Sequence, residues 1–138
     1  INYNTTDFVA AVADLTQGRG VDVILDIIGG SYVPRNIAAL ATDGRLVQIG
    51  LQGGDSAATI DMWPVMRRRL TITGSTLRPR SVEEKGHIAA ALRREVWPLL
   101  ERGSVKPIIY RTYPLADASA AHALMESGEH IGKIVLDV

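Results

Sequence analysis

One stretch in the first half of the chain carries the clearest pattern of hydrophobic and polar positions. Val21–Ile28 is an almost continuous apolar run, interrupted only by Asp22 and Asp26, and it stops at a pair of glycines. Such a run is typical of a strand buried on both faces, as in a parallel sheet covered by helices. A helical pattern follows over Tyr32–Ala41, and a second apolar strand is predicted over Arg45–Ile49. The pattern therefore predicts a strand–helix–strand unit with a right-handed crossover.

The segment before this unit predicts a short strand and one amphipathic helix. Ile1–Asn4 has a strand-like pattern, and Asp7–Thr16 places its apolar residues on one helical face. A threonine at the helix start can accept hydrogen bonds from the first backbone N–H groups, and Asp7 suits the positive end of the helix dipole. Because the chain opens on Ile1 rather than Met, in what looks like the middle of a strand, we expect it to be the later part of a longer protein.

The segment after the unit predicts a helix opening near Asp61 and a strand over Leu70–Leu77. The strand alternates in polarity, which suggests that one of its faces is wetter and that it lies at a sheet edge. An exposed edge strand favours pairing with a second copy of the chain. A long helix should then run from Ser81 to about Arg102, with a capping box at its start and a kink caused by Pro98 near Arg94 or Glu95.

The last 35 residues predict a second strand–helix–strand pattern. Ile108–Tyr113 lies between two prolines, the Ala-rich segment Leu115–Glu126 is helical from near Asp117, and Gly132–Val138 is a closing strand.

Composition narrows the classes of protein that this chain can represent. A length of 138 residues with 46% hydrophobic content suits about one domain. Equal numbers of basic and acidic residues, 15 of each, argue against binding nucleic acid through bulk charge, and Arg67–Arg69 is interpreted as a solvated helix end. No apolar run is long enough for a transmembrane helix. The absence of cysteine excludes disulfides, thiolate zinc sites and thiol nucleophiles, and it is compatible with a cytoplasmic enzyme.

No strong catalytic motif is present. His87, His122 and His130 are too far apart for a helical metal site, which leaves them as surface residues, with His130 the better functional candidate. Ser31 follows two glycines but lacks the G-x-S-x-G context, so it is expected to cap its helix. The chain contains neither a G-x-G-x-x-G nor a Walker motif, so it does not contain a phosphate-binding loop of either type.

Both strands of the central unit end in glycine, at Gly29-Gly30 and at Gly50. Ligands of open parallel sheets bind at the carboxyl ends of the strands, and glycine allows a flat ligand to approach the backbone. The two strand ends are therefore predicted to form the wall of a nucleotide or nicotinamide site. The alternative is that these glycines only turn the chain.

Five segments together resemble the C-terminal half of the zinc-free quinone oxidoreductases of the medium-chain dehydrogenase/reductase superfamily: Ile1–Phe8, Gly18–Gly30, Asp43–Gly50, Leu70–Arg78 and Gly132–Val138. The resemblance implies an α/β fold containing part of a Rossmann parallel sheet with helices on both faces. Residues 1–103 would be the C-terminal portion of the cofactor-binding domain, and residues 104–138 a tail that returns to a GroES-like catalytic domain.

On this resemblance the four strands of residues 1–77 correspond to strands 3, 4, 5 and 6 of the order 3-2-1-4-5-6, in the sequence Ile1–Asn4, Val21–Ile27, Arg45–Ile49 and Leu70–Leu77. Strand 1, which would pair with strand 4 at the centre of the sheet, has no counterpart. An apolar strand with an unpaired row of backbone groups is costly. We therefore expect the isolated chain to be inactive, and NADPH-dependent quinone turnover by it would refute this.

The resemblance also implies residue roles around the cofactor. Tyr3 would contact the adenosine side, although it could equally be a packing aromatic, and Ile28 and Gly29 would lie near a ribose. Lys133 would face the interdomain cleft, although a solvated lysine is an equal alternative. The residues implied beside the nicotinamide and its carboxamide are Gly50, Leu51, Gln52, Ser75, Thr76 and Leu77.

The activity implied is hydride transfer to a quinone or an activated alkene, from NADPH or alternatively from NADH. The resemblance also implies a homodimer joined through Leu70–Leu77 and no bound metal. Two alternatives stay open. One is the enoyl-reductase module of a polyketide or fatty-acid synthase. The other is a non-catalytic α/β domain for dimerisation or ligand sensing. The coding sequence upstream of Ile1 would discriminate among the three.

Overall fold

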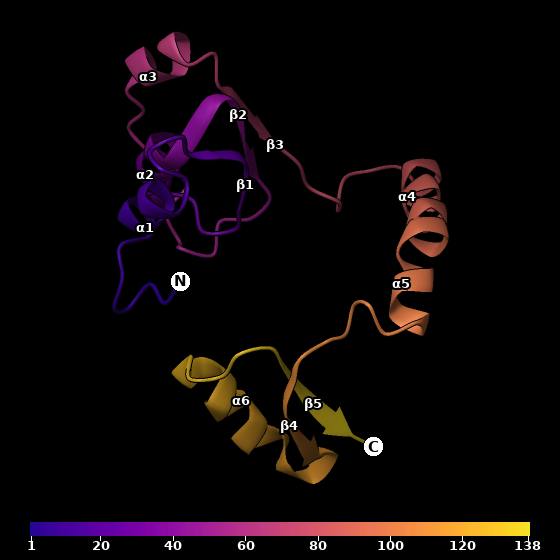
Figure 1. Ribbon diagram of the computed structural model, residues 1–138. Coiled ribbons are helices and arrows are strands. Elements are labelled where there is room, and N and C mark those ends of the chain that lie inside the picture. The colour runs from indigo at the N-terminus through magenta and orange to yellow at the C-terminus, as the bar shows by residue number, and fades with distance from the viewer. The chain divides into compact units, whose positions relative to one another are not determined.

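The computed structural model describes all 138 residues and divides into two compact units, residues 1–80 and residues 81–138. Each unit contains a parallel sheet with helices beside it (Figure 1), which confirms the α/β class. The boundary between the two units follows Arg80. The domain boundary at residue 103 that the resemblance implies therefore stays a prediction. No helix has the length and apolar character needed to cross a membrane.

The first unit is a three-stranded parallel sheet with order β1-β2-β3, so that β3 lies at an edge as predicted. It confirms that the segments taken as strands 4, 5 and 6 are neighbours in this order. Its elements are α1 (Phe8–Leu15), β1 (Val21–Asp26), α2 (Tyr32–Ala39), β2 (Leu40–Gln48), α3 (Met62–Arg67) and β3 (Thr71–Gly74).

β2 begins earlier than the sequence predicts, because Asp43-Gly44 forms part of the strand instead of ending α2. Val21 pairs with Leu40 and Val23 pairs with Arg45, so β2 advances five residues while β1 advances two. The extra residues bulge out of the ladder, and Asp43 takes a left-handed backbone conformation with φ of 62°. The bulge lets β2 follow α2 directly.

Two arginines at the end of α3 bind groups elsewhere in this unit. The basic cluster is otherwise solvated as predicted, since Arg67 and Arg69 are exposed and only Arg68 is partly buried. Arg68 donates to the carbonyls of Ile37 and Leu40 at 2.7 and 2.6 Å, and so satisfies carbonyl groups at the end of α2. Arg69 makes a two-pronged ion pair with Asp43, at 2.8 and 2.7 Å. These contacts tie the end of α3 to the start of β2.

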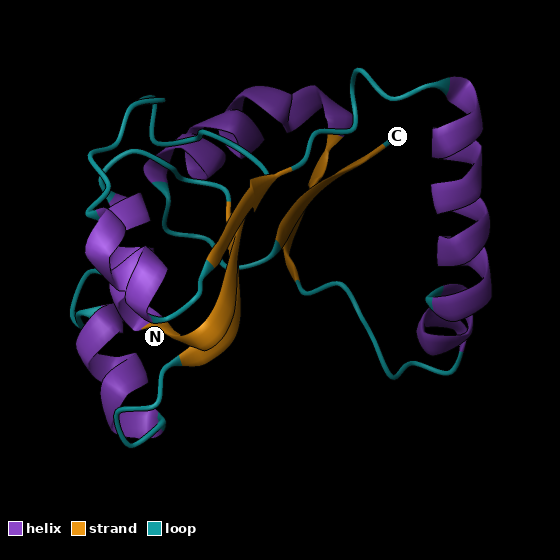
Figure 2. Cartoon of the chain, turned by 90° about the horizontal axis from the view of Figure 1, so that it is seen from above, coloured by secondary structure: helices purple, strands orange, loops and turns teal.

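The core lies on one face of the sheet only, whereas the sequence predicts helices on both faces. Ile37, Leu40, Leu46 and Leu70 form the buried cluster, with residues of α2 and α3 packed around it. α1 packs against α2 on this side. Figure 2 shows helices of this unit together on one side of its strands. On β1, Val23 and Leu25 are 58% and 67% exposed, so this strand is not buried on both faces within the chain.

Three local predictions near the N-terminus are wrong. Ile1–Asn4 contains a turn instead of a strand, because the Asn2 side chain accepts from the Asn4 N–H and no strand lies beside it for pairing. Asp7 itself caps α1 by accepting from the Ala10 N–H at 2.9 Å, in place of a threonine. Ser31 makes no capping hydrogen bond to α2.

The second unit comprises α4 (Val82–Glu95), α5 (Trp97–Glu101), β4 (Ile109–Pro114), η1 (Leu115–Asp117), α6 (Ala118–Ser127) and β5 (Lys133–Asp137). The capping box of Ser81 and Glu84 is present, and the long helix breaks after Glu95 as Pro98 predicts. β4 and β5 pair in parallel and are joined by α6, which confirms the predicted strand–helix–strand pattern.

Candidate functional site

The tips of β1 and β2 lie side by side and run in the same direction. The Ile49 N–H donates to the Asp26 carbonyl at 2.8 Å, and beyond the strands the Gln52 N–H donates to the Ile27 carbonyl, also at 2.8 Å. The Gly53 N–H continues this pairing to Ile28 at 3.0 Å. The prediction that the two glycine-terminated segments are parallel neighbours is therefore confirmed.

Gly50 suits the close packing of these two tips against each other. A Cβ atom at this position would lie 3.2 Å from the Ile27 carbonyl oxygen, which is a tighter contact than side chains normally tolerate. The close approach that the sequence attributes to a ligand is thus made first by the neighbouring strand. Its effect is that the two main chains present one continuous wall at the carboxyl edge of the sheet.

A pocket of about 470 Å³ lies between the tips of β2 and β3. It brings together four residues that were predicted to bind the cofactor, namely Gly50, Leu51, Ser75 and Thr76. Its complete lining is Gln48, Ile49, Gly50, Leu51, Gly74, Ser75 and Thr76, in which no side chain titrates near neutral pH. Aliphatic surface with a few amide and hydroxyl groups is the character of a small-molecule site, in which the polar groups fix the orientation of the ligand.

Part of the hydrogen-bonding capacity of this pocket is already used. The Ser75 N–H, which was predicted to be among the donors to the cofactor, donates to the Gln48 carbonyl at 3.0 Å. Ser75 Oγ accepts from Arg80 at 3.1 Å, so the hydroxyl proton is directed elsewhere. The Ser75 hydroxyl is therefore a better candidate donor than the Ser75 backbone.

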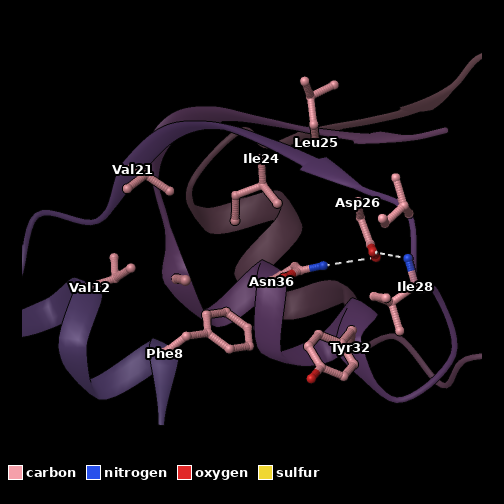
Figure 3. A pocket seen from close by; sticks show the side chains of 11 residues that line it. Phe8, Val12, Val21, Ile24, Leu25, Asp26, Ile28, Tyr32 and Asn36 are labelled. Carbon is pink, nitrogen blue, oxygen red and sulfur yellow. Dashed lines mark hydrogen bonds between the residues drawn. The ribbon is translucent and has the colours of Figure 1, made fainter. Parts of the chain in front are cut away.

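A buried carboxylate organises the tip of β1, and sequence reasoning did not identify it (Figure 3). Asp26 is 4% exposed. Its oxygens accept from the Ile28 N–H at 2.6 Å, the Gly29 N–H at 3.2 Å and the Asn36 side-chain amide at 3.0 Å. The network fixes the turn after β1 to α2. A polar residue within an apolar run, and a second on the apolar stripe of the next helix, were the available signals.

Ile28 and Asp26 line a second pocket, of about 280 Å³, on the α1 and α2 side of β1. Its outer wall is a stack of Phe8 and Tyr32 (Figure 3), whose ring centroids are 5.8 Å apart. The Arg35 guanidinium lies over both rings. Arg35 also bonds Asp7 at 2.7 Å. The pKa of Asp7 is lowered, first by the Ala10 N–H and then by Arg35.

The other predicted cofactor residues lie outside the larger pocket. Tyr3 is 71% exposed in the N-terminal turn, and Leu77 is exposed beyond β3. Gln52 contributes through its backbone, as the donor to Ile27, and the exposed Lys133 lies in the second unit, where its N–H donates to Ile108 at 2.7 Å. Thus the structure brings together four of the ten residues, and Ile28 and Gly29 adjoin them across the β1–β2 pairing.

The residues of this chain do not fit a metal site. No group of three or more His, Asp or Glu side chains is close enough to hold an ion. The three histidines lie on separate segments. His130 has a buried Nδ1 atom without a partner in the chain, and its ring meets Tyr110 edge to face at 6.3 Å.

Residues 1–136 match the zinc-binding dehydrogenase family. Over 132 residues the chain is 32% identical to a highly reducing polyketide synthase of Emericella nidulans, covering 95% of this chain and 5% of that protein. It is 34% identical over 137 residues to a hybrid PKS-NRPS synthetase of Aspergillus niger, covering 97% of this chain and 4% of that protein. The chain thus spans about a twentieth of the length of these relatives.

Solved structures of dehydrogenases and reductases are also similar to this chain over nearly all of its length. An NAD-dependent alcohol dehydrogenase matches with a TM-score of 0.71 and 32% identity, over 100% of this chain and 37% of that one. The CurK enoyl reductase matches with a TM-score of 0.68 and 26% identity, over 95% and 38%. A protein of Bacillus thuringiensis assigned as an NADPH:quinone reductase matches with a TM-score of 0.66 and 26% identity, over 100% and 42%.

Proposed function

Because the chain belongs to the zinc-binding dehydrogenase family, we propose that it supplies cofactor-binding elements of an NAD(P)H-dependent enoyl reductase within a reducing polyketide synthase. The observation that carries the proposal is the similarity of nearly the whole chain to reducing polyketide synthases, at 31–34% identity. The similarity to the CurK enoyl reductase supports the same reaction. The resemblance to quinone oxidoreductases described above favoured a quinone as acceptor, and the comparisons favour the alternative stated beside it.

The larger pocket suits the nicotinamide end of the cofactor. Ile49 and Leu51 offer aliphatic surface to the ring, while the Ser75 hydroxyl and the backbone around Thr76 offer hydrogen bonds to its carboxamide. Binding of a nicotinamide cofactor is supported by the similar solved structures, which include an NAD-dependent enzyme and one assigned as NADPH-dependent. The residues of this chain do not fit zinc despite the family name.

When bound, the reduced nicotinamide supplies a hydride that adds to the β-carbon of the enoyl thioester, while the α-carbon gains a proton and the double bond becomes single. The residues of this chain contribute orientation. Gly50 and Leu51 would hold one side of the ring, the Ser75 hydroxyl would fix its rotation, and the aliphatic side chains would exclude water. The lining contains no carboxyl, imidazole or amino group, so we expect the proton to come from a group outside this lining.

The test compares two acceptors in the full polypeptide that the gene encodes. Oxidation of NADPH is followed at its absorption band with an enoyl thioester such as crotonyl-N-acetylcysteamine, and then with a soluble quinone. We expect a kcat/KM for the thioester at least tenfold above that for the quinone. The reverse preference would favour the second candidate, a quinone reductase, which the Bacillus thuringiensis protein supports. Turnover of neither would favour the non-catalytic reading.

We also propose that β3 joins two copies of the chain into one continuous sheet. Thr71–Gly74 lies at the sheet edge, and all four of its residues are exposed. Unpaired backbone groups on such an edge favour addition of a further strand. Sedimentation velocity should show a dimer for the wild-type protein and a monomer for Thr73→Lys, because a lysine on an edge strand opposes strand pairing. A wild-type monomer would contradict the proposal.

A further inference from the structure

The chain bulges where β2 enters the larger pocket. The ladder donor moves on by three residues, from Ile49 to Gln52, while the acceptor moves by only one, from Asp26 to Ile27. Gly50 and Leu51 are therefore extra residues that leave the ladder, and both line the pocket. A carbonyl displaced from a ladder in this way needs another hydrogen-bond donor.

Gln48 supplies that donor. Its side-chain Nε2 donates to the Gly50 carbonyl at 2.5 Å and to the Asp26 carbonyl at 3.2 Å, so one amide group joins the bulge to the tip of β1. The orientation of the amide is fixed by its surroundings, because the opposite orientation would place its oxygen against two carbonyl oxygens. Gln48 also lines the pocket.

We propose that Gln48 is a positioning residue of the cofactor pocket. Its amide clamps the Gly50 carbonyl to the tip of β1 and holds the Gly50–Leu51 bulge in the conformation that shapes the pocket. The inference rests on the proposed function for the identity of the ligand, but the clamp itself is a property of the chain. Asp26 contributes to this arrangement twice: its side-chain carboxylate fixes the turn after β1, and its backbone carbonyl accepts from the Gln48 amide.

Two substitutions of Gln48 test the clamp differently. Gln48→Leu keeps most of the side-chain volume and removes the donor, and Gln48→Glu replaces the donor by an acceptor that faces two carbonyl oxygens. Ionised glutamate would be repelled from both carbonyls, whereas protonated glutamate could donate one hydrogen bond. Thr42→Val is the control, because it removes a polar group isosterically from an exposed position of the same strand, at the end of β2 away from the pocket.

The experiment measures the Kd for NADP⁺ of the full polypeptide and its variants, by calorimetry from pH 5 to pH 8. We expect Gln48→Leu to weaken binding by about five- to tenfold at every pH, which is the loss typical of one hydrogen bond. Gln48→Glu should bind at least as weakly at pH 8 and should approach the wild-type Kd as the pH falls, and Thr42→Val should match the wild type. Dividing each Kd by the wild-type value at the same pH removes the titration of the cofactor phosphates.

A ratio for Gln48→Glu that does not change with pH, or a Kd for Gln48→Leu equal to the wild-type value, would overturn the inference. Amide hydrogen exchange by NMR gives a readout without ligand. The Gln52 and Gly53 N–H groups close the bulge, and in Gln48→Leu both should exchange at least fivefold faster than in the wild type. If the wild type binds no NADP⁺, the proposed function fails, and the exchange rates alone decide whether the clamp exists.

Discussion

Asp26 is the side chain whose removal should cost this fold most for its size. The substitution Asp26→Ala leaves three donors without an acceptor, namely the N–H groups of Ile28 and Gly29 and the side-chain amide of Asn36. A buried donor left unsatisfied costs about 1–3 kcal/mol, and Ile28 is only partly buried, so we expect a loss of about 3–5 kcal/mol in the free energy of unfolding. This is a large share of the roughly 5–15 kcal/mol available to a typical domain.

The assay is urea unfolding of the chain followed by tryptophan fluorescence. Trp63 lies in the first unit and Trp97 in the second, so a Trp97→Phe background leaves a single reporter beside the sheet that contains Asp26. Asp26→Asn is the conservative variant: it keeps one oxygen acceptor, and we expect it to lose about half as much stability as Asp26→Ala.

The matched control is Asp22→Ala, four residues earlier on β1. The Asp22 side chain is exposed and bonds only Arg19 at the surface, so its removal should leave the unfolding midpoint almost unchanged. If Asp26→Ala and Asp22→Ala shift the midpoint equally, the buried network does not stabilise the turn after β1, and the role assigned to Asp26 is wrong.

Three further predictions concern the glycines, the surface charges and the pocket. Gly18→Ala and Gly20→Ala both place alanine at a left-handed φ, of 82° and 85°, but only the Cβ at position 20 would meet backbone atoms, at 2.7 Å. Urea unfolding should show that Gly18→Ala lowers the free energy of unfolding by about 1 kcal/mol and that Gly20→Ala lowers it by at least about 2 kcal/mol more. Equal losses would argue against the close contact. The hydrogen bond from Arg69 lowers the pKa of Asp43, so this pair stabilises the fold above the ordinary carboxyl pKa and loses that contribution as the pH falls through the lowered value. NMR titration of Arg69→Gln should show the pKa of Asp43 rising toward its ordinary value, and no change in this pKa would exclude Arg69 as the cause. Ser75→Ala should raise the Kd for NADP⁺ by about fivefold without changing the unfolding midpoint, and an unchanged Kd would remove the hydroxyl from the site.

The order of the elements, and the end of the sheet at which the candidate site lies, could be predicted from the pattern of residues along the chain. Apolar runs of strand length alternating with helical stripes dictate parallel pairing, and parallel strands bring their carboxyl ends to one edge. For this reason Gly50, Leu51, Ser75 and Thr76 could be assigned to one site from the sequence and its resemblance. Capping at Ser81 and the helix break before Pro98 were also predictable, because both depend on residues within a few positions of one another.

The polar groups that hold that edge together could not be predicted, because they lie far apart in the sequence and meet only in the folded chain. The Asp26–Asn36 contact spans ten residues and the bond from Gln48 to the Asp26 carbonyl spans 22, and each depends on how α2 and β2 are placed against β1. Likewise, Arg68 caps a helix 31 residues away, which no local pattern indicates. Periodicity reports which face of an element is apolar, but hydrogen bonds between elements depend on register, and here the bulges at Asp43 and at Gly50–Leu51 set that register.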